Sequence, residues 1–481
     1  MDFNKTVFKR RFSVNFFKNL RLDIARMSFT GKPDATRGDQ YPCLGKVARG
    51  GWDFERRLLC SLTPYMNVEL ASKAGPCGVS VSIAQHTLDL FIHRRNGETE
   101  LAVGEESVVI KEDNNRIVSV QICPGFLDVY SRAVNANSFC SEMRLLHSFK
   151  LPELEQIMVE KALNTATVAI LTPDIDKMYY VSAFMDCGVA QADPRAVKYE
   201  NGEIIENNGK LYFTFSARAE HGTYQCVMSW VAGTMRFELE GVILYCTADG
   251  VLGADDVAAS LMYDRTSGVW RINYASFSHG HVLGSAVFEG DVRFGVNIID
   301  TVLMPKAPAG LKVGEYDHML YGKDGDEDPD LFYDEKRGVW LKTLCRLVEE
   351  DGKNRYRYML FESDKVDGEY RFVSSTVSGE QTGGNIVRID GEMLFICGNA
   401  FDKRADYLVY RLPDLTHAQN LRFDYDDGGF RGWGTVIPVK RGTRTRHFHL
   451  TFDRVRNSSF NWFSGIIPLQ PQRHKYCRKT N

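Results

Sequence analysis

The sequence predicts an all-β protein in which an N-terminal β-sandwich, a lectin-like jelly roll, precedes a five-bladed β-propeller. The main observation is a repeated unit: an apolar run, a Gly-centred turn, and a second run rich in β-branched and aromatic residues. Further strand-like segments follow each copy, which suits a four-stranded blade repeated at about 50–70 residues. The second observation is a different strand spacing before residue 151. The five copies span residues 202–215, 259–274, 330–344, 385–397 and 434–450, with turn glycines Gly209, Gly268, Gly338, Gly391 and Gly442.

The N-terminal third of the chain divides into three predicted segments. Residues 1–24 form a basic tail, and residues 25–150 carry short strand candidates separated by turn residues, which is typical of a sandwich used as an accessory domain. Residues 151–164 place apolar side chains near helical spacing behind an acidic first turn. This pattern predicts a short linking helix.

The rest of the chain, residues 165–468, is the predicted propeller and catalytic domain. Its first stretch, 165–195, is expected to supply an outer strand that closes the ring with material from the end of the chain. Residues 469–481 are a polar C-terminal tail.

The composition limits the classes of binding partner and the cell compartment that are expected. A net charge of -3 gives no electrostatic reason to expect nucleic acid or an anionic membrane. No run approaches the roughly 18 apolar residues that a membrane span requires. The basic start lacks the apolar core of a secretory signal, and the 11 cysteines include no CxxC pair, so reduced thiols in a cytoplasmic protein are expected. Nothing in the sequence indicates an oligomeric state.

Acidic residues lead into the first three repeated units. Glu200 and Asp328 each stand four residues before an apolar pair, and Asp256, after Asp255, comes slightly earlier in its unit. The same place in the last two units holds Gly residues and Trp433. Because the starts of innermost strands surround the axis of a propeller, Glu200, Asp256 and Asp328 are predicted to share one axial pocket.

Grouped carboxylates point to glycosidic bond cleavage. One carboxylic acid protonates the leaving oxygen, while a second carboxylate attacks or activates water on the opposite face of the sugar. A third negative charge nearby raises the pKa of the acid and keeps it protonated. Loops expected at the same end supply candidate groups for binding sugar hydroxyls or stacking on a sugar ring: Arg218, His281, Asn399, Asp402, Arg404, Trp433 and Arg454.

Two stretches carry a resemblance to a known group of enzymes. EDPDLFYDEKRGVW (327–340) is similar to an Asp-Pro motif followed by its hairpin, and ENGEIIENNGKLYFTF (200–215) has the spacing of a first-blade motif. In both features the chain resembles five-bladed propeller glycoside hydrolases of the invertase/levansucrase and arabinanase/xylosidase clans. The resemblance implies that Glu200 is base or nucleophile and Asp328 a second catalytic carboxylate, with Asp256 assisting. Glu380 is the remaining candidate for the general acid.

The expected function is therefore an exo-acting glycosidase for furanosides or similar small sugar units. No cofactor is expected and no metal ligands are assigned, although such a channel is compatible with a structural divalent cation. Two alternatives stay open. A carbohydrate-binding propeller without catalysis would use the same pocket, and a glycoside phosphorylase would need a basic cluster there. Candidates for that cluster are Arg218, Arg346, Arg404 and Arg454.

Overall fold

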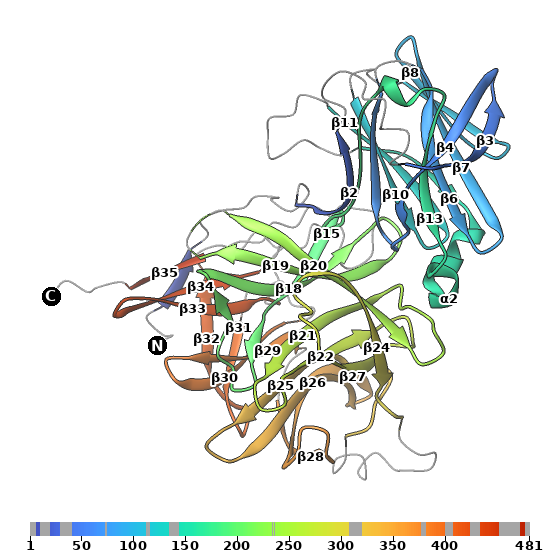
Figure 1. Ribbon diagram of the computed structural model, residues 1–481. Coiled ribbons are helices and arrows are strands. Elements are labelled where there is room, and N and C mark those ends of the chain that lie inside the picture. Colours follow the sequence, from blue (N-terminus) through green and yellow to red (C-terminus); the bar gives the residue numbers. More distant parts are fainter. Residues whose placement is uncertain are drawn as a thin grey trace.

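The part of the chain that the structure describes consists mainly of β-strands (Figure 1). The computed structural model describes residues 6–9, 20–28, 41–72, 75–111, 116–133, 144–232, 234, 236–306, 320–376, 381–399, 407–423, 433–451 and 472–476. Among the helical segments in these ranges, none is long and apolar enough to cross a membrane.

Two sheets form the part of the molecule that we call the N-terminal module, drawn in blue to teal in Figure 1. Their inward side chains contribute to one apolar core, which includes Val68, Val79 and Val120. The six-stranded sheet has the order β12 (Arg144–Lys150), β11 (Phe126–Ala133), β10 (Arg116–Cys123), β5 (Asn67–Ser72), β14 (Met178–Met185) and β2 (Leu22–Ser28). The seven-stranded sheet has the order β3 (Cys43–Arg49), β4 (Trp52–Ser61), β13 (Thr167–Thr172), β6 (Cys77–Ile83), β7 (His86–Arg95), β8 (Glu98–Val103) and β9 (Glu106–Lys111).

The predicted helix at 151–164 is a 3₁₀ segment, η3 (Pro152–Met158), followed by the single turn α2 (Glu160–Leu163). The chain then returns to the N-terminal module, with the short η4 (Ile175–Lys177) between β13 and β14. β13 pairs with β4 and β6, and β14 pairs with β2 and β5. The prediction that residues 165–195 supply an outer propeller strand is therefore wrong: β13 and β14 pair with strands far upstream, and the end of the stretch joins the propeller as an inner strand.

The remaining strands make five four-stranded antiparallel units, the arrangement of a five-bladed propeller, here called blades 1 to 5. Blade 1 contains β15 (Ala190–Ala196), β18 (Lys210–Arg218), β19 (Thr223–Val231) and β20 (Phe237–Thr247), with the short β16 (Lys198–Tyr199) and β17 (Glu206–Asn207) beside them. Blade 2 contains β21 (Asp256–Asp264), β22 (Val269–Ser276), β23 (Val282–Phe288) and β24 (Gly295–Leu303). Blade 3 contains β25 (Glu327–Asp334), β26 (Val339–Glu350), β27 (Lys353–Ser363) and β28 (Arg371–Ser375). Blade 4 contains β29 (Gln381–Ile389), β30 (Glu392–Asn399), β31 (Tyr407–Arg411) and β32 (Thr416–Phe423).

Blade 5 combines both ends of the chain. It contains β33 (Thr435–Arg441), β34 (Arg444–Leu450), β35 (Gln472–Tyr476) and, as its outermost strand, β1 (Thr6–Lys9). β1 runs antiparallel to β35 and parallel to β32 of blade 4.

The repeated hairpins of the sequence are confirmed for blades 2 to 5, where each joins the first two strands. All five turn glycines have positive φ, between 58° and 84°, a conformation that glycine adopts without steric cost. Blade 1 differs. Its innermost strand is β15, which pairs with β18, whereas residues 202–207 add only the two-residue β17.

The N-terminal module packs against the end of the propeller where the inner strands begin. The hydroxyl of Tyr65 donates to the carbonyl of Ala254, which precedes β21. The rings of Tyr65 and Tyr224 stack at 4.8 Å, and those of Phe126 and His221 lie 3.5 Å apart at an angle of 8°. These contacts hold the loops of blades 1 and 2 that border the axis.

Candidate active site

The inner strands of blades 1 to 4 share one irregularity. Each has a β-bulge, and at each bulge one residue takes positive φ: Asp193 (54°), Ala258 (55°), Asp328 (52°) and Gly383 (67°). Positive φ is uncommon for residues other than glycine and concentrates at functional sites. Because the bulge recurs at the same place in the blades, Asp193 and Asp328 reach the axis at the same level.

A ring of polar residues lies two positions further along the inner strands. It surrounds a cavity of about 10 Å³, room for at most one water molecule. Lys198 adds an ion pair to the ring through Nζ contacts of 2.8 and 2.7 Å with Asp330. The ring therefore closes the axis beneath Asp193 and Asp328. Its members, one from each blade, are Arg195, Ser260, Asp330, Asn385 and Thr435.

Asp328 is surrounded by donors. Arg195 Nη2 donates to Oδ1 at 2.7 Å, and Oδ2 accepts from Thr382 Oγ1 and the Gly383 N–H, both at 2.7 Å. Tyr358 Oη lies 3.4 Å from the same oxygen. Both oxygens thus act as acceptors, as they do in an ionised carboxylate.

Asp193 has the opposite environment. It is buried, and Ser216 Oγ donates to Oδ2 at 2.9 Å. Burial and then the charge of Asp328 raise the pKa of Asp193 to about 7, although Arg195 acts in the other direction. Two aspartates at one level of the axis therefore have environments that favour different protonation states, which is a mark of acid–base sites.

Glu327 is the third carboxyl of the cluster. Burial raises its pKa, and so does the charge of Asp328, against the hydrogen bond with His281. Thr382 Oγ1 lies 2.6 Å from Glu327 Oε1 and 2.7 Å from Asp328 Oδ2. A hydroxyl has one proton and can donate to only one of them. Because both oxygens of Asp328 act as acceptors, the Thr382 hydroxyl donates to Asp328. We infer that Glu327 carries the proton of its own contact with Thr382 Oγ1.

Glu200 lies at the other end of the propeller. Its carbonyl accepts from the N–H of Tyr333, five residues beyond Asp328 on β25, or about 16 Å at the rise of a strand. Its carboxylate binds Arg265 Nη2 at 2.6 Å and Nε at 2.9 Å, just after β21 ends. Burial alone would raise the pKa of Glu200, but the hydrogen bonds from Arg265 lower it. The prediction that Glu200 shares a cavity with Asp328 is wrong, because Glu200 follows the innermost strand of blade 1.

Asp256 is at the correct end but points into its own blade. Ser276 Oγ donates to Oδ1 at 2.8 Å and is itself 2.8 Å from His279 Nδ1. Burial raises the pKa of Asp256, although its hydrogen bonds with Ser276 and Ser278 act in the other direction. Asp256 precedes the bulge by two residues, as does the buried Asp326 in blade 3. The predicted convergence of Asp256 with Asp328 on one cavity is therefore not what the structure shows.

Three predicted binding residues border the cluster. His281 Nε2 is 3.2 Å from Glu327 Oε2. Arg218 pairs with Ala190 at the start of β15 and lies 3.9 Å from Asp255. Trp433 packs on Gly383, where an added Cβ would meet its side chain at 2.5 Å. The indole is only 5% exposed, so it presents little face for stacking on a sugar.

The other predicted site residues cannot be placed. Glu380, Asp402, Arg404 and Arg454 lie outside the described residues, as does the side chain of Asn399. Within the described ranges, no group of three His, Cys, Asp or Glu side chains is arranged to hold a metal ion.

The sequence interpretation missed Asp193. The signal was present, since Ala192-Asp193-Pro194 matches the Asp-Pro step of Glu327-Asp328-Pro329. Both aspartates stand at the bulge of an inner strand, and in both cases proline follows. Comparing the two Asp-Pro steps would have located the blade 1 carboxyl seven residues before Glu200.

No protein-family model matches the chain, and no curated protein matches its sequence. Among solved structures, the chain is similar to Bacillus subtilis levansucrase (12% identity, TM-score 0.39, covering 60% of this chain and 84% of that one). It is also similar to an α-L-arabinofuranosidase from Podospora anserina (12% identity, TM-score 0.36, covering 60% of this chain and 92% of that one). A third similar structure is Penicillium chrysogenum α-L-arabinanase (8% identity, TM-score 0.36, covering 75% of this chain and 90% of that one). The neighbours thus include both groups of propeller enzymes that the sequence resembles, at low identity and over part of the chain.

Proposed function

We propose that this protein is a glycoside hydrolase whose reacting groups are Asp193 and Glu327, with Asp328 as their ionised partner. The observation that carries the proposal is the carboxyl cluster at one end of the axis. Asp328 accepts from Arg195 and three further donors, while the pKa values of its two carboxyl neighbours are raised. Glycosidic cleavage needs this division between a protonated acid and an ionised carboxylate.

In the proposed reaction, Glu327 gives its proton to the glycosidic oxygen as the bond to the anomeric carbon breaks. The bonding electron pair leaves with that oxygen. Asp193, once ionised, either bonds to the anomeric carbon or takes a proton from the water that does so. Asp328 and Arg195 do not exchange protons. The negative charge of Asp328 favours the positively charged transition state and keeps Glu327 protonated.

The closed axis supports an exo-acting enzyme. Because the ring through Arg195 and Asp330 blocks the channel below the cluster, a substrate enters from one end only. A site that is open at one end only would accept the terminal unit of a chain, in keeping with furanosides or similar small sugar units as substrates. The proposed chemistry needs no cofactor.

The phosphorylase alternative lacks support among the described residues. Arg346 binds both oxygens of Asp326, at 2.8 and 2.7 Å, and Arg195 is paired with Asp328. Arg218 lies near Asp255, and its pKa is lowered by burial, partly offset by Asp255 and Asp193. Each of these cations faces a carboxylate of the protein, so none is set aside for phosphate.

The test is a screen of aryl α- and β-furanosides and pyranosides, with and without phosphate, using the purified full chain. On an active substrate, Asp193→Asn should lower kcat by roughly 10²–10⁴-fold, and Glu327→Gln should do so on the corresponding alkyl glycoside, whose leaving group needs protonation. The matched control is Glu200→Gln, a buried carboxylate at the opposite end, which should retain turnover within a few fold. If Asp193→Asn and Glu327→Gln also remain within a few fold of the parent, the assignment is wrong. Unchanged binding of oligosaccharide without turnover by any variant or parent would favour a binding propeller.

A further inference from the structure

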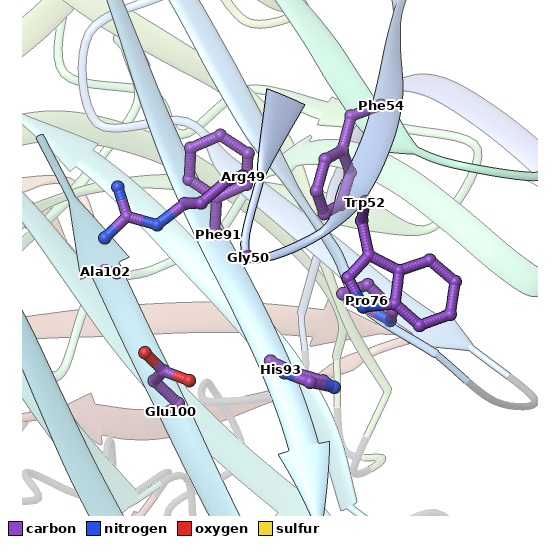
Figure 2. Close-up of a pocket in the computed structure, with 9 residues that line it drawn as sticks. All are labelled: Arg49, Gly50, Trp52, Phe54, Pro76, Phe91, His93, Glu100 and Ala102. Carbon is purple, nitrogen blue, oxygen red and sulfur yellow. The ribbon is translucent and has the colours of Figure 1, made fainter. Parts of the chain in front are cut away.

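The N-terminal module has a hollow on the outer face of its seven-stranded sheet, on strands β3, β4, β7 and β8. Its volume is about 60 Å³, so it is a shallow depression, well below the roughly 300–1,000 Å³ of pockets that enclose a drug-sized ligand. Figure 2 shows the indole of Trp52 on one side and Arg49 and Glu100 on the other. The lining residues are Arg49, Gly50, Trp52, Phe54, Pro76, Phe91, His93, Glu100 and Ala102.

An apolar floor explains why the hollow exists. Phe54, Phe91 and Leu171 form a cluster separate from the main core of the module, with Trp52 packed against it. The rings of Phe54 and Phe91 meet edge to face at 5.0 Å. At Gly78 an added Cβ would stand 2.0 Å from the carbonyl oxygen of Leu90 and 3.3 Å from Leu171, so only glycine lets the strands approach here. The outer face of this sheet therefore has an apolar base of its own, away from the core that stabilises the module.

The rim offers both a donor and an acceptor. His93 and Glu100 are directly paired across β7 and β8. Arg95 Nε donates to His93 Nε2 at 2.8 Å, which places the ring proton on Nδ1. Burial, followed by the charge of Arg95, lowers the pKa of His93 and keeps the ring neutral. Glu100 Oε1 accepts a hydrogen bond from Ser107 Oγ at 3.1 Å, and the exposed carboxylate can accept further hydrogen bonds.

The charges of the rim fit a neutral ligand. Arg49 donates to the carbonyl of Gly104 at 2.7 Å, and its guanidinium lies 5.1 Å from the centre of the Phe91 ring. The carboxylate of Glu100 on the same rim would repel an anion, and the guanidinium would repel a cation. An aromatic wall with paired donors and acceptors suits a molecule that has one apolar face and a circumference of hydroxyls.

We propose that this hollow is a carbohydrate-binding site in which a sugar ring stacks on Trp52 and its hydroxyls bond to His93, Glu100 and Arg49. The site lies in the N-terminal module, apart from the carboxyl cluster. Its occupant is a neutral saccharide unit of a chain whose end reaches the propeller. The inference rests on the proposed function only in the choice of saccharide.

The test uses the full chain carrying Asp193→Asn, so that the saccharide survives the measurement. Native gel electrophoresis with arabinan, galactan or levan in the gel reports binding as retardation, and titration calorimetry gives the affinity. Adding Trp52→Ala should abolish retardation, and adding Glu100→Gln, an exposed change compatible with folding, should weaken binding about tenfold or more. The conservative Trp52→Phe should retain part of the affinity. The control is Val109→Ala, a residue 59% exposed on β9 of the same sheet, which should have no effect.

The results separate this site from the proposed reaction. In a chain that retains Asp193, Trp52→Ala should leave hydrolysis of a small aryl glycoside unchanged and slow hydrolysis of the polysaccharide. Equal retardation of the parent, Trp52→Ala and Glu100→Gln, or no retardation of the parent by any of the three polysaccharides, would overturn the site while leaving the carboxyl cluster untouched. Retardation that depends on Trp52 would stand even if Asp193→Asn proved fully active.

Discussion

Replacing Asp193 by asparagine should stabilise the protein, and the gain should grow with pH. Asp193 has a pKa of about 7 in the folded chain and 3.8 as its ordinary value. Between these values the folded chain holds a proton that the unfolded chain has released, so stability falls as pH rises through this window. The difference of about three pKa units corresponds to about 4 kcal/mol at pH 8, at 1.36 kcal/mol per unit. Asparagine avoids this cost and can still accept the hydrogen bond that Ser216 Oγ donates.

Thermal unfolding at pH 4.5 and pH 8 measures the effect, since about 1 kcal/mol moves Tm by roughly 2–4 °C in a domain of 150–250 residues. Asp193→Asn should exceed the parent by only about 2–4 °C at pH 4.5, where about 1 kcal/mol of the cost has developed, and by about 8–16 °C at pH 8. The matched control is Asp330→Asn, an equally buried aspartate two residues past the bulge of blade 3, which binds Lys198. It should lose about 3–5 kcal/mol, because it leaves a buried lysine without its carboxylate. A Tm difference between Asp193→Asn and the parent that is the same at both pH values would refute the raised pKa and the role built on it.

Three further outcomes follow from the cluster and from Glu200. Initial rates should rise as pH increases toward about 7, because Asp193 must ionise before it can act, and a rate flat from pH 5 to 8 would contradict this. Glu327→Gln should slow substrates with alkyl leaving groups far more than aryl glycosides, whose leaving groups need little protonation; equal losses in kcat would remove Glu327 as the acid. Glu200→Gln should cost about 1 kcal/mol or less in unfolding free energy, since its partner Arg265 is 42% exposed, and a larger loss in urea unfolding would show that this pair matters more than its exposure suggests.

The blades could be predicted because their hairpins are local. A turn glycine such as Gly268 or Gly338 lies between two strands that pair with each other, so pattern and structure coincide within about 15 residues. β13 could not be placed in this way. Its partners on β4 are more than 100 residues upstream, and nothing in its apolar run says which sheet it joins.

The innermost strand of blade 1 was missed because polar side chains of the site replace the apolar residues that mark a strand in the sequence. β15 reads AQADPRA, with Gln191, Asp193 and Arg195 where an ordinary strand has apolar residues. Gln191 bonds to the carbonyls of Cys187 and Gly188, Asp193 to Ser216 of β18, and Arg195 to Asp328 and the Pro329 carbonyl of blade 3. Tertiary contacts therefore override the pattern. The apolar pair Ile204-Ile205 and the turn at Gly209 fit the pattern of the expected hairpin. Glu200, which precedes them, was therefore predicted as the carboxylate of blade 1. The pairing of Asp193 with Asp328 depended on finding the correct strand first.

The position of β1 sets the order in which this molecule can be completed. Val7 is paired with Arg422, and Thr6 with Tyr476, so β1 is synthesised more than 400 residues before its partners. At a synthesis rate of roughly 5–20 residues per second, that strand waits on the order of 20–90 s with its backbone groups unpaired. An unpaired strand is a template for joining another chain. Newly made molecules would then be most prone to associate during this interval. When blade 5 forms, β1 and β35 join the open set of blades into a closed ring, and detaching either strand would disrupt the same blade.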